Sequence, residues 1–283
     1  MRKSFILLVF CLSAKIAYPQ KFFTTFFGGI SNYSGDLSGS NYFLRHSHPA
    51  WGLGLMSELS DRVFIRADFV SAKISGDDKW GTVNRQRNLS FKSDIAEFSL
   101  AAEYTLFNLY EYKVSPYFFA GVAAFQFKPT TTDVNGNYII LPDYSTEGQG
   151  FYEGRKPYKL RQVSFPLGGG VLWGITNNKR IGFVFGVRKT FTDYLDDVST
   201  TYADQTVLAQ NRGFGAVAIA WRGDDYNGVP YPAAGTKRGN PENNDWYFFS
   251  GATIRVRIQP KGSERRDAVK KPRKARYGCP VVW

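Results

Sequence analysis

The chain has 283 residues, a formal net charge of +12, 17% aromatic residues and 28 glycines. It contains no apolar run of about eighteen or more residues, which excludes a membrane-spanning helix. The composition instead favours a β-barrel of the outer-membrane type, with a soluble all-β sandwich or barrel as the alternative.

The N-terminus has the features of a secretion signal. Residues 1–3 carry positive charge, residues 5–12 are apolar, and small residues follow. We therefore expect residues 1–19 to be removed, with the cleavage point anywhere between 14 and 20. Cys279 is then the only cysteine left, so it stays a free thiol or pairs with another chain.

Eight segments alternate between apolar and polar positions with the period of two that is typical of a strand. They are expected at residues 21–30, 51–58, 63–74, 94–106, 114–127, 158–175, 181–187 and 246–258. In the fourth segment every even position from Ala96 to Leu106 is apolar or aromatic. The fourth and fifth segments are long enough for the roughly nine to eleven residues that a tilted strand needs to cross a bilayer.

The connections between these segments alternate in length. Short connections are expected near 59–62, 108–113 and 176–179, and long ones at 31–49, 75–93, 129–157 and 192–244. Outer-membrane barrels have short periplasmic turns and long outer loops. The sequence therefore predicts an all-β, eight-stranded antiparallel transmembrane barrel over residues 20–258, with both termini in the periplasm.

Charged residues on the polar faces of these segments are expected to point into the lumen. They are Arg66, Asp68, Glu97, Glu103, Arg188, Arg255 and Arg257. A basic side chain that faces lipid at the bilayer middle costs about 2–4 kcal/mol, which excludes the opposite orientation. Because an eight-stranded barrel is filled by side chains, the charges inside it must pair. Arg66 and Glu103 lie at similar distances from short turns on neighbouring strands, which predicts a contact between them.

The last segment, residues 259–283, lacks strand periodicity and carries eight basic residues against Glu264 and Asp267. The positions expected to dock a partner are Arg265, Arg266, Lys270, Lys271, Arg273, Lys274, Arg276, Cys279 and Trp283. We expect a flexible, basic periplasmic tail that binds an acidic partner or stays solvated, whereas nucleic acid is implausible in that compartment.

Chemistry-bearing residues are few. The two histidines, His46 and His48, could form a protease-like rim with Asp193, Asp196 and Asp197, but nothing in the sequence holds these residues together. The same aspartates could bind calcium, although carboxylates that order a loop or stay solvated are the favoured interpretation. We predict no enzymatic activity, no metal and no cofactor.

Five segments occur together in the order found in a known family. They are residues 32–36 (NYSGD), 87–94 (RNLSFKSD), 146–150 (TEGQG), 191–200 (FTDYLDDVST) and 238–247 (RGNPENNDWY). As an ordered set they resemble the PorG family, the outer-membrane barrel subunit of the type IX secretion system of Bacteroidota. The resemblance implies an eight-stranded barrel that docks on the periplasmic ring formed by the PorK lipoprotein and PorN, without a cofactor.

The function predicted from these observations is a non-enzymatic barrel that anchors a periplasmic secretion assembly to the outer membrane of a Gram-negative bacterium. The short turns and the basic tail would face that assembly. Two alternatives stay open. One is a binding protein or adhesin that acts through the outer loops, and the other is a small pore, which a filled lumen disfavours.

Overall fold

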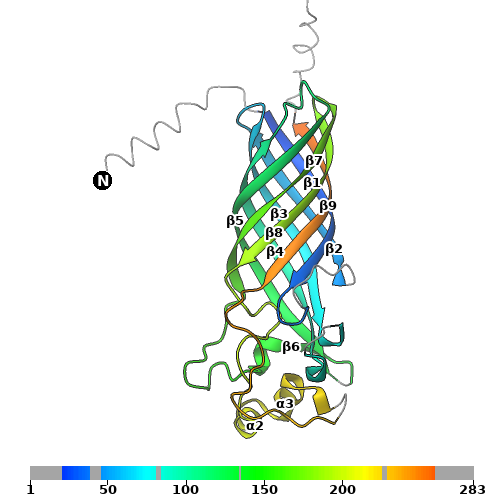
Figure 1. The fold of residues 1–283 in the computed structure, drawn as a ribbon. Helices are drawn as coiled ribbons and strands as arrows, with labels where there is room; N and C mark the ends of the chain where they lie inside the picture. Colours follow the sequence, from blue (N-terminus) through cyan, green and yellow to red (C-terminus); the bar gives the residue numbers. More distant parts are fainter. Residues whose placement is uncertain (1–20, 39–45, 81–83, 134, 225–227, 259–283) are drawn as a thin grey trace, which may run out of the picture.

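The computed structural model describes residues 21–38, 46–80, 84–133, 135–224 and 228–258 (Figure 1). Eight long antiparallel strands form its main body. They are β1 (Lys21–Ser34), β2 (His48–Glu58), β3 (Val63–Asp77), β4 (Ser90–Thr105), β5 (Val114–Thr132), β7 (Arg161–Thr176), β8 (Lys179–Thr190) and β9 (Trp246–Ile258). The expected signal segment and the basic tail lie outside the described residues.

The eight strands close on themselves. The hydrogen-bonded order is β4-β3-β2-β1-β9-β8-β7-β5, and an additional pairing of β4 with β5 completes the circle. The pairing of β1 with β9 joins the two ends of the chain's barrel segment, from Phe22 opposite Ile258 to Ser34 opposite Trp246. The expected closed, eight-stranded antiparallel barrel is confirmed.

The strand faces follow the sequence pattern. In β4 buried and exposed residues alternate along most of the strand, with Glu97 and Glu103 inside and Phe98 and Leu100 outside. The outer face carries most of the exposed large apolar side chains, whereas the lumen contains polar and charged groups. No helix in the described part of the chain is long and apolar enough to span a membrane.

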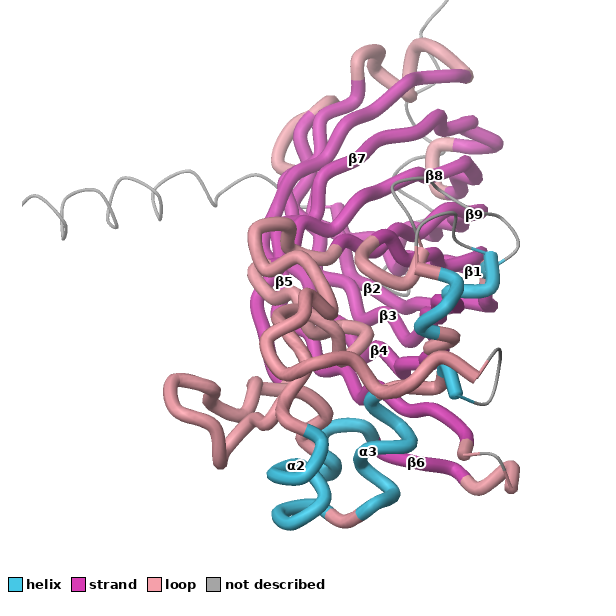
Figure 2. Tube along the Cα trace, turned by 60° about the horizontal axis from the view of Figure 1, so that its bottom comes forward, coloured by secondary structure: helices cyan, strands magenta, loops and turns pink. Residues whose placement is uncertain are grey.

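Two ends of the barrel differ in their connections. At the turn end, the chain reverses at residues 59–62, 106–113 and 177–178, as expected. At the loop end, which lies at the bottom of Figure 1, the long connections gather over the barrel mouth (Figure 2). We use the names turn end and loop end for these two ends below.

The long connections are more ordered than the sequence pattern indicated. They contain the short strand β6 (Tyr138–Ile140), the helices α2 (Gln205–Arg212) and α3 (Phe214–Ala220), and the 3-10 turns η2 (Asp78–Trp80), η3 (Arg85–Arg87) and η4 (Leu141–Tyr144). The two helices inside the connection at residues 192–244 were not predicted from the sequence. The apolar side of α3 packs inward, with Val217 and Ile219 buried, and this packing stabilises helices too short to form alone.

Strands β3, β4 and β5 continue past their expected ends at the loop end. Their extensions enclose an apolar core shared with the loops. Its buried members include Leu37, Ile74, Leu89, Phe91, Phe127, Leu195 and Ile219. The expected boundaries at residues 74, 94 and 127 were therefore short, because the partners that bury the extra strand residues come from distant loops.

Candidate functional site

Inside the barrel, the predicted charges form ion pairs around buried carboxylates. The carboxylate of Glu103 accepts hydrogen bonds from Arg255 at 2.5 Å and 3.1 Å, and from Arg66 Nη1 at 3.3 Å. Arg66 Nε lies 3.0 Å from Asp68 Oδ2. The structure thus contains the expected contact between Arg66 and Glu103, and it adds Arg255 as the closer partner. Both guanidinium groups also lie over aromatic rings, which further compensates their burial.

A second ion pair lies nearer the loop end. Arg188 donates to both oxygens of Glu97, at 3.2–3.4 Å, and the Tyr247 hydroxyl donates to Glu97 Oε2 at 2.6 Å. Arg188 also covers the ring of Phe249 at 4.2 Å. Each carboxylate is thereby matched by cations and hydroxyl donors, as burial of charge requires.

A third carboxylate, which sequence reasoning missed, closes the turn end. Glu58 accepts from Lys21 at 2.6 Å and from the Tyr110 hydroxyl at 2.6 Å, and Arg180 lies 3.4 Å away. Tyr110 comes from the turn between β4 and β5, so that turn folds across the barrel mouth. Arg257, the remaining predicted lumen charge, contacts Asn178 Oδ1 at 3.4 Å in the β7–β8 turn.

The lumen is packed rather than open. A cavity of about 40 Å³ lies between the Glu97 and Glu103 pairs and is lined in part by Thr25, Arg188 and Arg255. This volume holds only a few water molecules. Gly168 and Gly170 allow the packing, because a Cβ atom at either position would lie within 3 Å of the ring of Phe119 or Tyr117. Both glycines are therefore positions where neighbouring groups pack closely in a narrow lumen.

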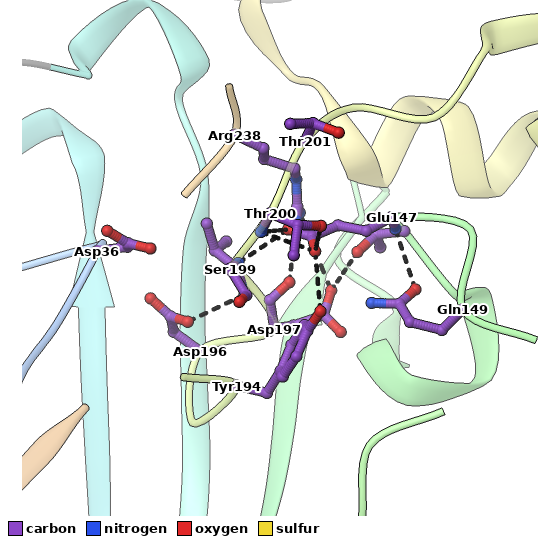
Figure 3. Close-up of polar contacts among 12 residues, drawn as sticks. Asp36, Glu147, Gln149, Tyr194, Asp196, Asp197, Ser199, Thr200, Thr201 and Arg238 are labelled. Carbon is purple, nitrogen blue, oxygen red and sulfur yellow. Dashed lines mark hydrogen bonds and ion pairs between the residues drawn. The ribbon is translucent and has the colours of Figure 1, made fainter. Parts of the chain in front are cut away.

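A second polar cluster lies at the loop end and is built around Glu147 (Figure 3). The Glu147 carboxylate is fully buried and accepts hydrogen bonds from the backbone of Ser199 at 2.8 Å and of Thr200 at 3.0 Å. The Thr200 hydroxyl, at 2.6 Å, and the Tyr194 hydroxyl, at 3.2 Å, add two further bonds. Arg238 Nη1 completes the set at 3.0 Å. One side chain thus joins the loop after β6 to both parts of the loop after β8.

Arg238 connects this carboxylate to Asp197. Its Nη1 donates to the Asp197 carbonyl at 2.6 Å, and its Nη2 lies 3.9 Å from the Asp197 carboxylate. Thr146 and Tyr158 donate their hydroxyls to that carboxylate at 2.5 Å and 2.6 Å. Burial lowers the Arg238 pKa, but the two carboxylates outweigh it, and the net pKa is raised. The guanidinium therefore stays charged at every physiological pH.

A further ion pair ties in the loop between β3 and β4. Arg87 makes a two-point contact with Asp78, at 2.8 Å from Nε and 2.6 Å from Nη2. The same guanidinium donates to the backbone carbonyls of Arg238 and Asp36. Asp36 in turn accepts from the backbone of Asn240 at 2.8 Å. All four long loops thus meet in one network, which we call the cap network.

The aspartates of the loop after β8 lie inside this network. Asp196 and Asp245 both accept from the Tyr33 hydroxyl, at 2.6 Å and 3.1 Å. Burial, followed by neighbouring carboxylates, raises the pKa of both groups. Burial also raises the pKa of Asp193 to about 9 and that of Asp197 to about 6. Asp193 therefore holds a proton near neutral pH, and the buried Asp196 and Asp245 pair binds protons more tightly than free carboxyl groups do.

The structure gives the histidines a different setting from the protease-like rim. His48, at the start of β2, has its Nε2 atom 2.7 Å from the hydroxyl of Ser75 on β3. Asp196 and Asp197 instead accept hydrogen bonds from tyrosine and threonine hydroxyls. Within the described ranges, no group of three or more His, Cys, Asp or Glu side chains is positioned to hold a metal ion. The loop-ordering interpretation of the aspartates agrees with their contacts.

Sequence reasoning did not predict the cap network, although most of its members lie in the five segments named above; Asp78 and Tyr158 are exceptions. Each segment supplies at least one residue: Tyr33 and Asp36, Arg87, Thr146 and Glu147, Asp193 to Thr200, and Arg238 to Asp245. The feature of the sequence that could have indicated it is the high frequency of Asp, Glu and Arg in long connections that also contain Tyr and Leu. Pairing partners more than 90 residues apart could not be assigned from spacing alone.

The chain matches the family described as domain of unknown function (DUF6089) over residues 2–217. A search of curated proteins gives no match. Among solved structures the chain is similar to Neisserial surface protein A, with a TM-score of 0.43, 10% identity, and coverage of 84% of this chain and 97% of that chain. It is also similar to Ail of Yersinia pestis, solved in complex with the heparin analogue sucrose octasulfate, with a TM-score of 0.41, 9% identity and coverage of 84% and 99%. A major outer membrane protein from Thermus thermophilus gives a TM-score of 0.41, 14% identity and coverage of 85% and 100%.

Proposed function

We propose that this chain, which belongs to the DUF6089 family, is a non-enzymatic outer-membrane barrel that anchors the periplasmic part of a type IX secretion system. The observation that carries the proposal is the distribution of side chains in the closed barrel. Ion pairs fill and block the lumen, whereas the outside is apolar, so the barrel acts through its surfaces and its two ends.

Membrane insertion follows from elementary energetics. Residues such as Leu55, Phe98, Leu167 and Phe183 are about half exposed around the barrel, and burial of apolar surface contributes about 25 cal/mol per Å². A closed barrel leaves no unpaired strand edge in lipid. The even strand number places both ends of the barrel segment, near Lys21 and Ile258, at the turn end. We assign the turn end to the periplasm and the loop end to the exterior.

The docking partners in this proposal are the PorK lipoprotein and PorN. The resemblance of the five segments to the PorG family supports them. The turn end presents exposed apolar side chains suited to a protein contact, including Leu59, Phe107 and Tyr112. Residues 259–283 follow β9, which ends at the turn end, and their positive charge would favour an acidic surface on the partner.

A pull-down of the ring proteins from cells tests this assignment. We compare the full chain with a chain cut after Gln259 and with the double variant Leu59→Glu, Tyr112→Glu at the turn end. Tyr138→Glu, an equally exposed aromatic at the loop end, is the matched control. We expect the cut chain and the double variant to lose PorK and PorN, and the control to recover them as the full chain does. Full recovery and normal secretion with both the tail and the turns altered would contradict docking.

The ordered loop end favours one alternative, a binding protein that acts through its outer surface. Phe214 on α3 is 83% exposed and Tyr138 on β6 is 61% exposed, so the cap presents aromatic side chains to the outside. The double variant Phe214→Ser, Tyr138→Ser separates the two functions. Docking predicts unchanged secretion, whereas an adhesin would lose attachment of cells to its target surface.

A further inference from the structure

A shallow groove of about 610 Å³ runs along the outside of the barrel near the loop end. Ala96 on β4 and Ala124 on β5 form its floor. Larger side chains border it: Phe69, Phe98, Val163 and Phe191. The hollow exists because the two small residues on β4 and β5 lie among larger ones on the same and on neighbouring strands. Since these are outward positions, the groove opens into the surroundings of the barrel.

Cations gather where this groove meets the loop end. Lys159 and Arg161 line the groove itself, and Arg161 Nε donates to Gln126 Oε1 at 3.4 Å. On the adjoining strands, outward positions carry Lys73, Lys92 and Lys128. In the strand register Asp94 lies between Lys73 and Lys128, and it pairs with Lys73 at 3.3 Å. The patch therefore has five cations and one carboxylate among these described outward positions.

Outward cations at the loop end lie on five consecutive strands, from β3 to β8, because Lys189 on β8 is also exposed there and lies 5.9 Å from the centre of the Trp246 ring. At the loop end of β9, β1 and β2, the outward positions are Trp246, Ile30 and Trp51, which are apolar or aromatic. A general interfacial girdle would place cations all around. The coincidence of a local cluster with the end of an apolar groove indicates a site with two parts, one for an apolar chain and one for an anion.

We propose that this groove binds a phosphate-bearing lipid of the outer leaflet, with an acyl chain along Ala96 and Ala124 and the phosphate beside Lys128, Lys159 and Arg161. The proposal rests on the proposed membrane location, and it does not depend on docking at the periplasmic side. Long basic side chains at the edge of a membrane extend their charges to the headgroup level while their stems cover apolar surface. Each such charge near an anionic surface contributes about 1 kcal/mol.

Native mass spectrometry of the purified barrel with bis-phosphorylated lipid A tests this site. The triple variant Lys128→Gln, Lys159→Gln, Arg161→Gln removes the cations. The matched control Arg62→Gln, Lys113→Gln, Lys179→Gln removes three exposed cations at the turn end. A third variant, Ala96→Leu with Ala124→Leu, fills the groove with lipid-facing apolar atoms and leaves the charge unchanged. A heat-dependent gel shift confirms that each variant is folded.

We expect the triple variant to bind lipid A roughly a hundredfold more weakly, from about 1 kcal/mol for each of three cations. The groove-filling variant should also bind more weakly, and the turn-end control should bind as the original chain does. Dephosphorylated lipid A should show the same loss as the triple variant. The proposal would be overturned if the triple variant bound lipid A as tightly as the original chain does. It would also be overturned if inorganic phosphate alone displaced all of the bound lipid A. Failure here leaves docking intact, because the measurement contains no secretion partner.

Discussion

Glu103 shows how single residues hold the barrel interior together. Its carboxylate is 1% exposed and lies between the guanidinium groups of Arg255 and Arg66. Placing a charge in such an environment is costly unless the partners are close and oriented, and here one arginine binds it with two hydrogen bonds. The contribution of the pair becomes visible when one partner is removed, because the other charges then stay buried without compensation.

Replacing Glu103 with Gln is expected to destabilise the barrel by about 3–5 kcal/mol, because Arg255 and Arg66 lose their shared carboxylate. The midpoint of the heat-dependent gel shift measures this change. Asp94→Asn is the control, since its side chain is 62% exposed and its pair with Lys73 contributes about 0–1 kcal/mol. Similar midpoints for the two variants would mean that the lumen charges are solvated rather than paired.

The carboxyl groups of the cap network predict a dependence on pH. Burial raises the pKa of Asp193 to about 9, and it also raises the pKa of Asp196 and Asp245. In an open loop these groups would have an ordinary pKa of about 3.9, so the closed cap binds more protons between that value and the raised one. The stabilisation is therefore complete at acid pH and is lost as the pH rises toward 9.

Limited proteolysis of the loop over residues 192–244 measures this effect. We expect cleavage at pH 9 to be at least about tenfold faster than at pH 6, after correction for protease activity, because one pKa unit corresponds to about 1.4 kcal/mol. Asp193→Asn should reduce the dependence, since the amide cannot lose a proton. Asp224→Asn, an exposed position in the same loop, should leave it unchanged. A rate independent of pH would rule out protonated carboxyl groups in the cap.

At the scale of elements, the cap network fixes how the loops lie against the strands. Helices α2 and α3 are only eight and seven residues long, and Asp204 caps the first of them through the backbone of Thr206 and Val207. Isolated helices of this length are unstable in water. Their order therefore depends on tertiary contacts, namely the apolar packing of both helices and the Glu147 and Arg238 pair, which joins the connection before β7 to the connection before β9.

Replacing Glu147 with Gln should release these elements together. The amide keeps one acceptor, but the ion pair with Arg238 and several of the hydrogen bonds at the carboxylate are lost. We expect protease cleavage between residues 192 and 244 to rise at least about tenfold, since breaking a buried pair costs about 3–5 kcal/mol. Glu153→Gln on the same connection is exposed and should have no effect. Unchanged cleavage in the first variant would show that apolar packing alone holds the loops.

For the whole molecule, the filled lumen predicts that the barrel is not a diffusive pore. Glu58, with its partners Lys21, Tyr110 and Arg180, covers the turn end. The Glu97 and Glu103 ion pairs fill the middle, and the cap network covers the loop end. In planar bilayers we expect the barrel to show no steady conductance steps. A variant without Tyr110 and without the cap residues would open both ends and still retain the two central pairs. Stable, reproducible steps from the unmodified chain would contradict the closed-barrel interpretation and favour the pore.

The barrel itself could be predicted from the sequence because its determinants are local. Alternation with a period of two is visible within each segment, and it fixed which residues face inward, including Glu97, Arg188 and Arg255. Alternating short and long connections fixed the antiparallel order of the strands. The contact of Arg66 with Glu103 could be anticipated because β3 and β4 are neighbours, and the two residues lie at similar distances from the short turns at 59–62 and 108–113.

The tertiary structure alone decided what the long loops do. Glu147 pairs with Arg238, and Asp196 with Tyr33, across 91 and 163 positions of sequence, so neither spacing nor periodicity could assign them. The helices α2 and α3 were missed for the same reason, since they are stable only where the cap buries their apolar sides. The outer groove required both kinds of information: Ala96 and Ala124 are visible in the sequence, but the pairing of β4 with β5 makes them diagonal neighbours on the outer face.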